Sequence, residues 1–324
     1  MNAQLVKLET SGGYGKTLLR WSVSLGLLGL LFTRFDFSTI LRVCLRATPG
    51  FFAGALLLYL LSQVVSALRW CRLARGVGFS AGYAECLEFY TIGMFFGLVV
   101  PSTLGSDAAR ALYLGESPPG RAAAFSSVLF DRLIGLVMLA AVAAVALLGP
   151  HADLPVALEL VVVGICLSLT AAWFSIPLLA RLLPPEQRWR RLVEEELLPF
   201  FRDPALLGSA AMLSLCVHLL QILSQWMLTW SLGLDVPFGF VAMYHPLVAL
   251  AAALPLTIGG FGLREAAYAA LLPYGGVNPD DAIALGLLWW AVAAIGALGG
   301  GLVYGLSSRP MPSLRGAAGR YGSR

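Results

Sequence analysis

The chain contains long apolar runs separated by short polar loops, and several runs are long enough to cross a bilayer as a helix. Hydrophobic residues make up 58% of the 324 residues and charged residues only 12%, about half the charged share of soluble domains. A soluble helical protein of this composition would need many helices that are apolar all round, so we set that class aside. Six runs are clear candidates for spanning helices: Leu18–Phe32, Phe51–Leu68, Ser126–Leu148, Pro155–Leu179, Ala205–Trp230 and Ile283–Leu306. The first has basic flanks but no small-residue cleavage site, so we expect a retained helix rather than a signal peptide.

Two further apolar segments, Phe89–Leu114 and Phe238–Leu272, are each interrupted in the middle by the same pattern, P-x3-G-x4-R. Chance alone predicts roughly 0.1 such match in a chain with this much Pro, Gly and Arg. An arginine placed just after a Pro/Gly break in an apolar segment is costly in a membrane and therefore indicates a functional position. The two copies, 154 residues apart, are Pro101-Ser-Thr-Leu-Gly105-Ser-Asp-Ala-Ala-Arg110 and Pro255-Leu-Thr-Ile-Gly259-Gly-Phe-Gly-Leu-Arg264.

The placement of Lys and Arg predicts that the two interrupted segments turn back instead of crossing. With six crossings and two re-entrant hairpins, the basic loops fall on one side, which matches the positive-inside rule with both termini cytoplasmic. The opposite loops, around Gly149–Asp153, Leu232–Pro237 and Pro273–Asp281, contain no Lys or Arg. A full crossing by the first segment alone would place the basic loop 181–202 outside. The cytoplasmic set would be Arg69, Arg72, Arg75, Arg121, Arg181, Arg188, Arg190, Arg191, Arg202, Arg309, Arg315, Arg320 and Arg324.

Three basic residues do not fit this sorting. Arg34, Arg42 and Arg46 would lie on the outer side, within Phe35–Ala47. We expect this stretch to form a short amphipathic helix at the membrane interface.

The 154-residue offset also predicts an inverted repeat. It places Phe51–Leu68 on Ala205–Ile222, and Ala124–Gly149 on Asn278–Val303. Each half, about 17–150 and 155–306, would hold three crossings and one hairpin, and an odd number of crossings inverts the second half. The predicted fold is an all-α polytopic membrane protein with six spanning helices and two re-entrant broken-helix hairpins. One integral membrane domain would cover 1–308, followed by a disordered basic cytoplasmic tail at 309–324.

The residues after each central glycine predict a helix start that could bind an anion. Ser106 or Asp107 can cap a helix over Ala108–Leu114, and Gly259-Gly260 precede a helix through Arg264. A helix N-terminus offers free N–H groups, and an arginine within the first turn adds a guanidinium that suits a phosphate. We therefore expect one phosphate site at each leaflet, based on Gly105 and Arg110 and on Gly259, Gly260 and Arg264.

Ion pairing is the competing interpretation of these arginines. Arg110 could pair with Asp107 or Asp131, and Arg264 with Glu265, simply to neutralise buried charge. Both interpretations hold if the acid releases the arginine when a headgroup arrives. Asp131 itself could orient Arg110 or form an interfacial pair with Arg132.

Two spanning helices carry matching polar residues at helical spacing. The first stripe comprises Tyr59, Ser62, Gln63, Ser66 and Arg69, and the second comprises Ser214, His218, Gln221 and Gln225. These stripes are typical either of interhelical hydrogen bonding or of a polar groove for a headgroup.

The sequence contains no nucleophile elbow, P-loop or paired-carboxylate loop, so we expect no enzyme activity. The five cysteines and three histidines lack metal-ligand spacing, and we expect no cofactor or metal. The basic residues cluster in loops as topology requires, so nucleic acid is not an expected partner.

At these motifs the sequence resembles the flippase-like transmembrane family, the membrane region of lysylphosphatidylglycerol synthase (multiple peptide resistance factor). The resemblance covers roughly Leu18–Leu306, with Ser106 standing where a second glycine is expected. It implies movement of lipid across the bilayer, while lysyl transfer is not expected because no soluble synthase domain follows Leu306. The residues that carry it are Arg69-Trp70, Gly93, Phe96, Pro101, Gly105, Asp107, Arg110, Asp131-Arg132, Gly135, Pro255, Gly259-Gly260, Gly262 and Arg264-Glu265.

The leading hypothesis is an inner-membrane lipid translocase without its own ATPase. Arg110 and Arg264 would hold the phosphate of a phospholipid or lipid-linked headgroup in turn, and the breaks at Pro101 and Pro255 would line a central cavity. The alternative is a non-transporting accessory subunit that works with enzymes of lipid or glycan-lipid biosynthesis.

Overall fold

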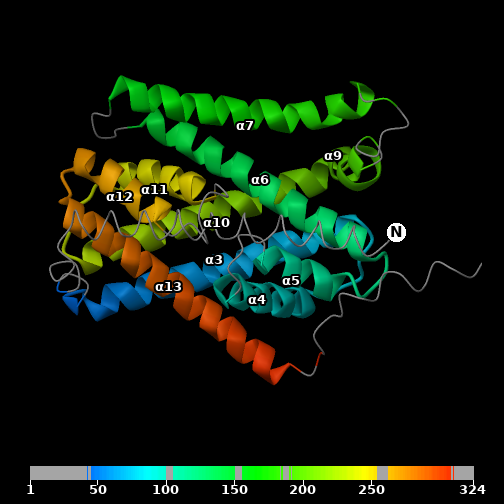
Figure 1. Cartoon of the computed structure of the whole chain (residues 1–324), viewed down its shortest axis with the longest axis horizontal. Coiled ribbons are helices and arrows are strands. Elements are labelled where there is room, and N and C mark those ends of the chain that lie inside the picture. Colours follow the sequence, from blue (N-terminus) through cyan, green and yellow to red (C-terminus); the bar gives the residue numbers. More distant parts are fainter. Residues whose placement is uncertain are drawn as a thin grey trace, which may run out of the picture.

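The computed structural model describes residues 42, 45–99, 105–149, 155–182, 184, 190, 192–253, 262–307 and 309, and within them it contains helices and no strand. Most helices run along the long axis of the molecule (Figure 1). The elements are α3 (Pro49–Gly76), α4 (Tyr83–Val99), α5 (Gly105–Leu114), α6 (Arg121–Leu147), α7 (Val156–Leu182), the π-helix η1 (Leu192–Leu197), α9 (Leu198–Arg202), α10 (Pro204–Ser231), α11 (Phe238–Ala253), α12 (Leu263–Leu271), the 3₁₀-helix η2 (Leu272–Gly275) and α13 (Pro279–Leu306).

Five helices are long and apolar enough to cross a membrane: α3, α6, α7, α10 and α13. They confirm five of the six predicted spans, and the chain is a multi-pass membrane protein. Three of them begin with a proline in the first turn, at Pro49, Pro204 and Pro279, where the missing N–H costs nothing. The predicted span Leu18–Phe32 and most of the predicted interfacial stretch Phe35–Ala47 lie outside the described residues.

The centre of the bundle is an antiparallel pair formed by α3 and α10. At one end, the Thr48 N–H donates to the Ser231 carbonyl over 2.7 Å. Further along, the Ser224 hydroxyl donates to the Ala55 carbonyl over 2.7 Å. At the far end, Gly76 lies against the Leu206 side chain, which would have to move to admit an added Cβ. These contacts fix α3 and α10 in opposite directions.

The two interrupted segments form pairs of shorter helices. α4 and α11 have 17 and 16 residues and are about 25 Å long, while α5 and α12 have 10 and 9 residues and are about 15 Å long. The latter two are too short for a hydrocarbon core of about 30 Å. In Figure 1, α4 and α5 lie toward one end of the bundle and α11 and α12 toward the other.

The start of α5 corrects a prediction. Neither Ser106 nor Asp107 caps this helix, because it already begins at Gly105. Ser106 instead packs its backbone and hydroxyl against Gly93 of α4, where an added Cβ would stand 2.8 Å from the Ser106 carbonyl oxygen. The Asp107 carboxylate faces two arginines and is not available to the helix terminus. The second half agrees with prediction, since α12 covers Leu263–Leu271.

The helix layout repeats at the offset of the sequence motif. A shift of 154 residues overlays α3 on α10 and α4 on α11 to within one residue at each end, and places α5 on α12 and α6 on α13 to within about five. The packing follows the same correspondence, because α4 packs on α13 and α11 packs on α6. The longer helix of each short pair therefore packs on the last long helix of the other half, and the shorter helix packs on that of its own half.

Glycines on α13 allow this close packing. A Cβ at Gly300 would overlap the carbonyl oxygen of Thr91 on α4, and one at Gly301 would press on the Phe95 ring. Small residues that let helix backbones approach are a common source of association between membrane helices.

We predict that Gly300→Leu lowers the thermal unfolding temperature of the detergent-purified protein, because the backbone of α4 must shift to admit the side chain. Overpacking of this kind costs about 1–3 kcal/mol. Gly299→Leu is the matched control: its Cβ meets no atom within 4 Å and the gain in helix propensity is the same. Equal unfolding temperatures for the two variants would contradict the packing.

Candidate functional site: a buried arginine cluster beside a polar cavity

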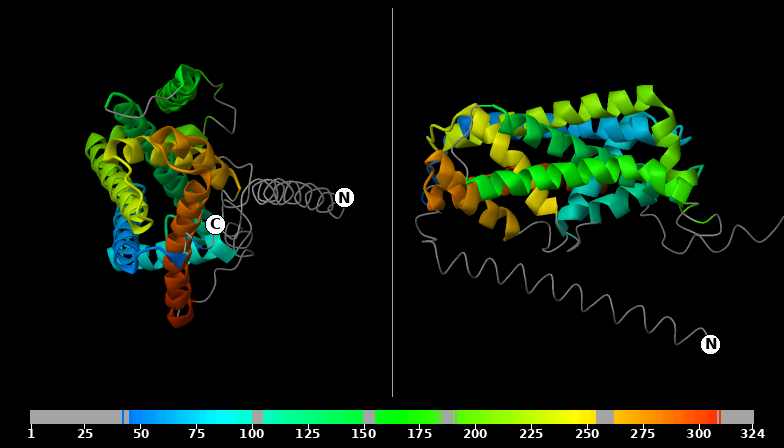
Figure 2. Two further views of the ribbon diagram at one scale, coloured as in Figure 1. Left: turned by 90° about the vertical axis from the view of Figure 1, so that its left-hand side faces the viewer. Right: turned by 90° about the horizontal axis from the view of Figure 1, so that it is seen from above.

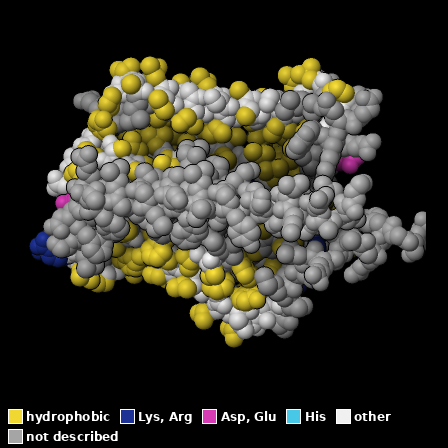
Figure 3. Space-filling model, viewed as in Figure 1, with side chains coloured by type: hydrophobic (Ala, Val, Ile, Leu, Met, Phe, Trp, Pro, Cys, Tyr) yellow, Lys and Arg dark blue, Asp and Glu magenta, His cyan; other side chains and the backbone are white. Residues whose placement is uncertain are grey.

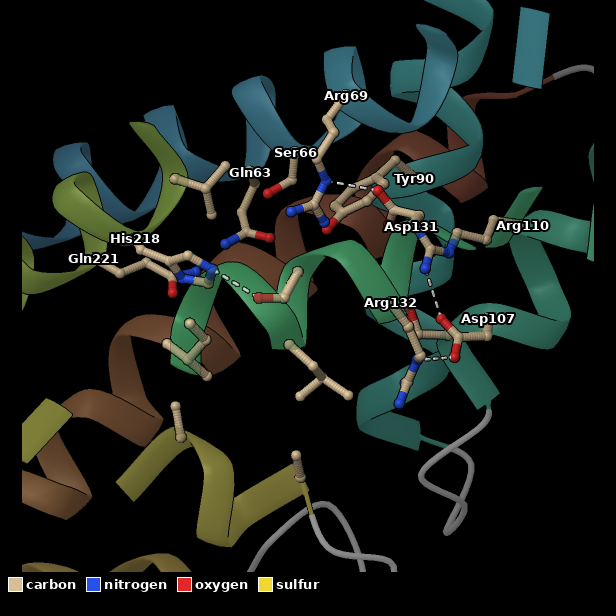
Figure 4. A pocket seen from close by; sticks show the side chains of 17 residues that line it. Gln63, Ser66, Arg69, Tyr90, Asp107, Arg110, Asp131, Arg132, His218 and Gln221 are labelled. Atoms are coloured by element: carbon tan, nitrogen blue, oxygen red, sulfur yellow. Dashed lines mark hydrogen bonds and ion pairs between the residues drawn. The ribbon is translucent and has the colours of Figure 1, made fainter. Parts of the chain in front are cut away.

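A cavity of about 340 Å³ lies between the central helices and the first short pair. Its polar walls come from α3, α4, α5, α6 and α10 (Figure 4). The cavity brings together most of the predicted site residues of the first half with residues of α10. The polar and charged side chains that line it are Gln63, Ser66, Arg69, Tyr90, Ser106, Asp107, Arg110, Asp131, Arg132, His218 and Gln221.

Asp131 is the central group of this cluster. It is 2% exposed, and its two carboxylate oxygens accept from two different arginines. Arg69 Nε donates to Oδ1 over 2.7 Å, and Arg110 Nη1 donates to Oδ2 over 3.0 Å. The carboxylate thereby ties α6 to both α3 and α5. A carboxylate buried this deeply among apolar helices requires such compensation.

Arg110 is held from several sides. Its Nη2 donates to Asp107 Oδ1 over 2.8 Å, in addition to the contact with Asp131. Its guanidinium lies 5.3 Å from the centre of the Trp70 ring and 5.2 Å from that of Tyr90, distances typical of cation–π contacts. The Arg110 Nε is buried without a hydrogen-bond partner in the described part of the chain.

Arg132 completes a chain of alternating charges. Its Nε pairs with Asp107 Oδ2, while 41% of its side chain stays exposed. An interfacial pair between Asp131 and Arg132 is therefore wrong as an interpretation, because Asp131 faces the interior and Arg132 turns to Asp107. Both ion pairs considered for Arg110 are present. The order of the cluster is Arg69, Asp131, Arg110, Asp107 and Arg132.

The cluster carries an excess of positive charge. Three arginines and two aspartates leave one net positive charge, and these five are the charged residues lining the cavity within the described residues. The third arginine, Arg132, is partly exposed, so an anion that enters the cavity can reach the positive end of the cluster. A cavity of this size with one excess positive charge can bind a small monoanion.

The sequence predicts Arg69 both in the polar stripe of its helix and among the cytoplasmic arginines; in the structure it is 6% exposed and lies within α3. Its Nη1 also donates to the Ser214 hydroxyl over 2.8 Å. Gly135 makes room for it, since an added Cβ would stand 3.3 Å from Arg69 Nη1. The Gly135 carbonyl contacts His218 Nε2 over 3.0 Å. Arg69 therefore lines the first cavity together with Gln63 and Ser66 of the same predicted stripe.

A second cavity of about 350 Å³ surrounds the second predicted arginine. Arg264 is the one charged residue that lines it among the described residues. His245, which the sequence left without a role, is 2% exposed, and both its ring nitrogens lack a hydrogen-bond partner in the described part of the chain. Gln63 and Gln221 line this cavity as well as the first. The remaining walls include Tyr59, Tyr268 and Trp289.

Glu265 lies beside Arg264 at the start of α12. Its Oε2 accepts from the Gly262 N–H over 2.8 Å, and its Oε1 is buried without a hydrogen-bond partner among the described residues. Glu265 therefore caps the helix, as a carboxylate at the third helical position commonly does. Four other predicted positions, Pro101, Pro255, Gly259 and Gly260, lie outside the described residues. The described residues hold no group of three His, Cys, Asp or Glu placed to bind a metal.

The chain is similar to known membrane proteins along most of its length. Residues 17–300 match the family model described as the lysylphosphatidylglycerol synthase TM region. The UPF0104 membrane protein PH1989 of Pyrococcus horikoshii is 22% identical over 297 residues, covering 80% of this chain and 88% of that protein. The UPF0104 membrane protein MJ1595 of Methanocaldococcus jannaschii is 30% identical over 99 residues, and that match spans only 29% of each chain. No solved structure matches.

We predict that Asp131→Asn strongly destabilises the protein, because Arg69 and Arg110 would stay buried with less compensating charge. Loss of one partner from a buried ion pair costs about 3–5 kcal/mol. Thermal unfolding in detergent measures the effect. Glu116→Gln, which breaks the exposed pair with Arg121, is the control and should cost at most about 1 kcal/mol.

A double variant tests the same pair more directly. Arg110→Gln combined with Asp131→Asn should destabilise less than the sum of the two single changes. Each single change leaves a buried charge with one partner fewer, and the second change removes that charge. Additive losses would contradict a direct charge interaction between the two side chains.

Proposed function

The chain belongs to the lysylphosphatidylglycerol synthase transmembrane family, and we propose that it is a lipid translocase that moves a phospholipid between leaflets. The observation that carries the proposal is the excess positive charge of the buried cluster beside the first cavity. A phosphodiester headgroup carries one negative charge and would neutralise it. Guanidinium groups suit this ligand because they donate paired N–H bonds to phosphate oxygens.

Phosphate binding at the first cavity would proceed by exchange of partners. Arg110 contacts both Asp107 and Asp131, so an arriving phosphate would take over one of these contacts. Asp107 is the partner to be displaced, because it also faces the half-exposed Arg132 and keeps a counter-charge after release. Asp131 would continue to hold Arg110 in place through the exchange.

The second cavity supplies a receiving site. Arg264 provides the positive charge there, and His245 offers a buried ring nitrogen that has no partner in the described part of the chain. Gln63 and Gln221 line both cavities and would donate and accept hydrogen bonds as the headgroup passes between them. A continuous series of polar groups is what lowers the cost of moving a phosphate through an apolar bundle.

We further propose that the short pairs α4/α5 and α11/α12 are re-entrant hairpins of an inverted repeat. Their lengths support this, as do their positions toward opposite ends of the bundle (Figure 1). The end that holds Arg72, Arg75, Arg121 and Arg309 would face the cytoplasm of the cell membrane, by the positive-inside rule. Both termini would then lie on the cytoplasmic side.

One observation favours the alternative of a non-transporting accessory subunit. Arg110 already contacts two carboxylates and two aromatic rings, which is sufficient to explain it as a structural brace. Such a subunit would bind enzymes of lipid or glycan-lipid biosynthesis without moving lipid itself. A transport assay separates the two functions.

We predict that the purified protein, reconstituted in phosphatidylcholine vesicles with a trace of fluorescent phosphatidylglycerol, accelerates the exchange of the fluorescent lipid between leaflets. The Arg110→Ala/Arg264→Ala variant should lose this acceleration because both phosphate contacts are gone. Reduction of outer-leaflet fluorophore by dithionite measures the exchange.

Arg121→Ala is the matched control, since it removes an arginine from an exposed pair outside both cavities. It should keep the wild-type rate. Wild-type exchange no faster than in protein-free vesicles would refute the translocase and leave the accessory subunit. Wild-type exchange that survives in the double variant would refute the role of the two arginines.

Cysteine labelling tests the proposed topology. In a cysteine-free background, Glu116→Cys and Tyr274→Cys introduce thiols at half-exposed positions that follow α5 and α12. We predict that an impermeant maleimide added to intact cells labels Tyr274→Cys and not Glu116→Cys. Labelling of both from one side would rule out oppositely directed hairpins.

A further inference from the structure

A third cavity, almost entirely apolar, lies between α7 and the pair α11/α12. Its volume is about 690 Å³, roughly twice that of either polar cavity. α7 packs on α6 and stands to one side of the bundle, as the end-on view in Figure 2 shows. Hydrophobic side chains line the recess beneath α7 (Figure 3). The walls are formed by Leu136, Val161, Val162, Gly164, Ile165, Ser168, Leu169, Leu247, Leu250, Ala251, Ala253, Ala267, Ala270 and Leu271.

This apolar groove adjoins the polar cavities. Leu136 lines both the groove and the cavity of the arginine cluster. Ala253 lines the groove and both polar cavities, so the three spaces lie next to one another at this residue. A single molecule at this junction would have an anionic part next to arginines and an apolar part in the groove. That combination of chemistries is the combination found in a phospholipid.

The dimensions of the groove also suit an acyl chain. Its wall on α7 runs from Val161 to Leu169, which is about 12 Å along the helix axis. One leaflet of the hydrocarbon core is about 15 Å deep. The opposite wall contributes four alanines, Ala251, Ala253, Ala267 and Ala270, whose short side chains leave the space open.

We propose that the groove between α7 and α11/α12 holds an acyl chain of the same lipid whose phosphate occupies the arginine-lined cavity. The lipid enters laterally past α7, its headgroup moves through the polar cavities, and its chain stays in the groove. This inference rests on the proposed translocase function and names its substrate class as a lipid with an acyl chain, in place of a soluble phosphate.

Photocrosslinking distinguishes this bound lipid from bulk lipid. Gly164 lines the groove and Gly299 lies on an exposed face of α13, and an added Cβ at either position meets no atom within 4 Å. The photoreactive residue p-benzoylphenylalanine is placed at one position or the other. The protein is reconstituted in phosphatidylcholine vesicles that contain a trace of tritiated phosphatidylglycerol.

We expect several-fold more tritium crosslinked at Gly164 than at Gly299. Arg132→Gln, which weakens the headgroup site, should remove the excess at Gly164 and leave Gly299 unchanged. Equal labelling at the two positions, or an excess at Gly164 that Arg132→Gln leaves intact, would mean that the groove holds bulk lipid only. Either result overturns the proposal.

Filling the groove provides a functional readout. Gly164→Phe should slow leaflet exchange of fluorescent phosphatidylglycerol several-fold, whereas Gly299→Phe should not. Wild-type exchange in Gly164→Phe would refute acyl-chain binding in the groove without contradicting the translocase function. If the wild-type protein itself gives no exchange, the translocase function is refuted. If glycerol phosphate protects the cavity from inactivation by an arginine reagent and no lipid crosslinks at Gly164, the ligand is a soluble anion and the proposal fails.

Discussion

The two buried ion pairs of Asp131, with Arg69 and with Arg110, are the interactions on which the helix arrangement in the first half of the chain depends. A buried carboxylate without compensation would cost several kcal/mol, so α3 and α5 must approach α6 closely enough for Arg69 and Arg110 to reach it. The neighbouring glycines follow from this requirement. Gly135 leaves space for the Arg69 guanidinium, and Gly93 lets the start of α5 approach α4. The local sequence is therefore organised around charge as much as around apolar packing.

A purely structural cluster would be most stable with equal numbers of positive and negative groups. This cluster instead has a third arginine, Arg132, which is exposed enough to be hydrated but still pairs with Asp107. The extra charge adds little to the bracing of Arg110, which two carboxylates already hold. It does lower the cost of releasing Asp107, because that carboxylate keeps a partner when Arg110 turns to another anion. This arrangement is the one that the proposed exchange of partners requires.

The sequence predicted the parts of the fold that depend on local pattern. Apolar length alone located five spans, and the offset between two motifs matched the offset between helices. Long-range contacts were less accessible. Arg69 and Asp131 are 62 residues apart, so the sequence placed Arg69 in a polar stripe without indicating its partner. The predicted cap of α5 was wrong because the helix begins at Gly105 and the Asp107 carboxylate pairs with Arg110 of α5 and Arg132 of α6. The place of His245 in a cavity depends on helices that are far apart in the sequence.

The sizes of the two polar cavities restrict the kind of headgroup that could pass. Both are about 350 Å³ or slightly less, at the lower end of the range of roughly 300–1,000 Å³ that holds small-molecule ligands. A phosphate esterified to a small alcohol has a size that suits such a space. Gln63 and Gln221 line both cavities, and their uncharged amides can hydrogen-bond a phosphate without holding it as tightly as a charged group would. In the proposed translocase, each arginine cavity would bind the phosphate, and these neutral amides would support its transfer from one cavity to the other.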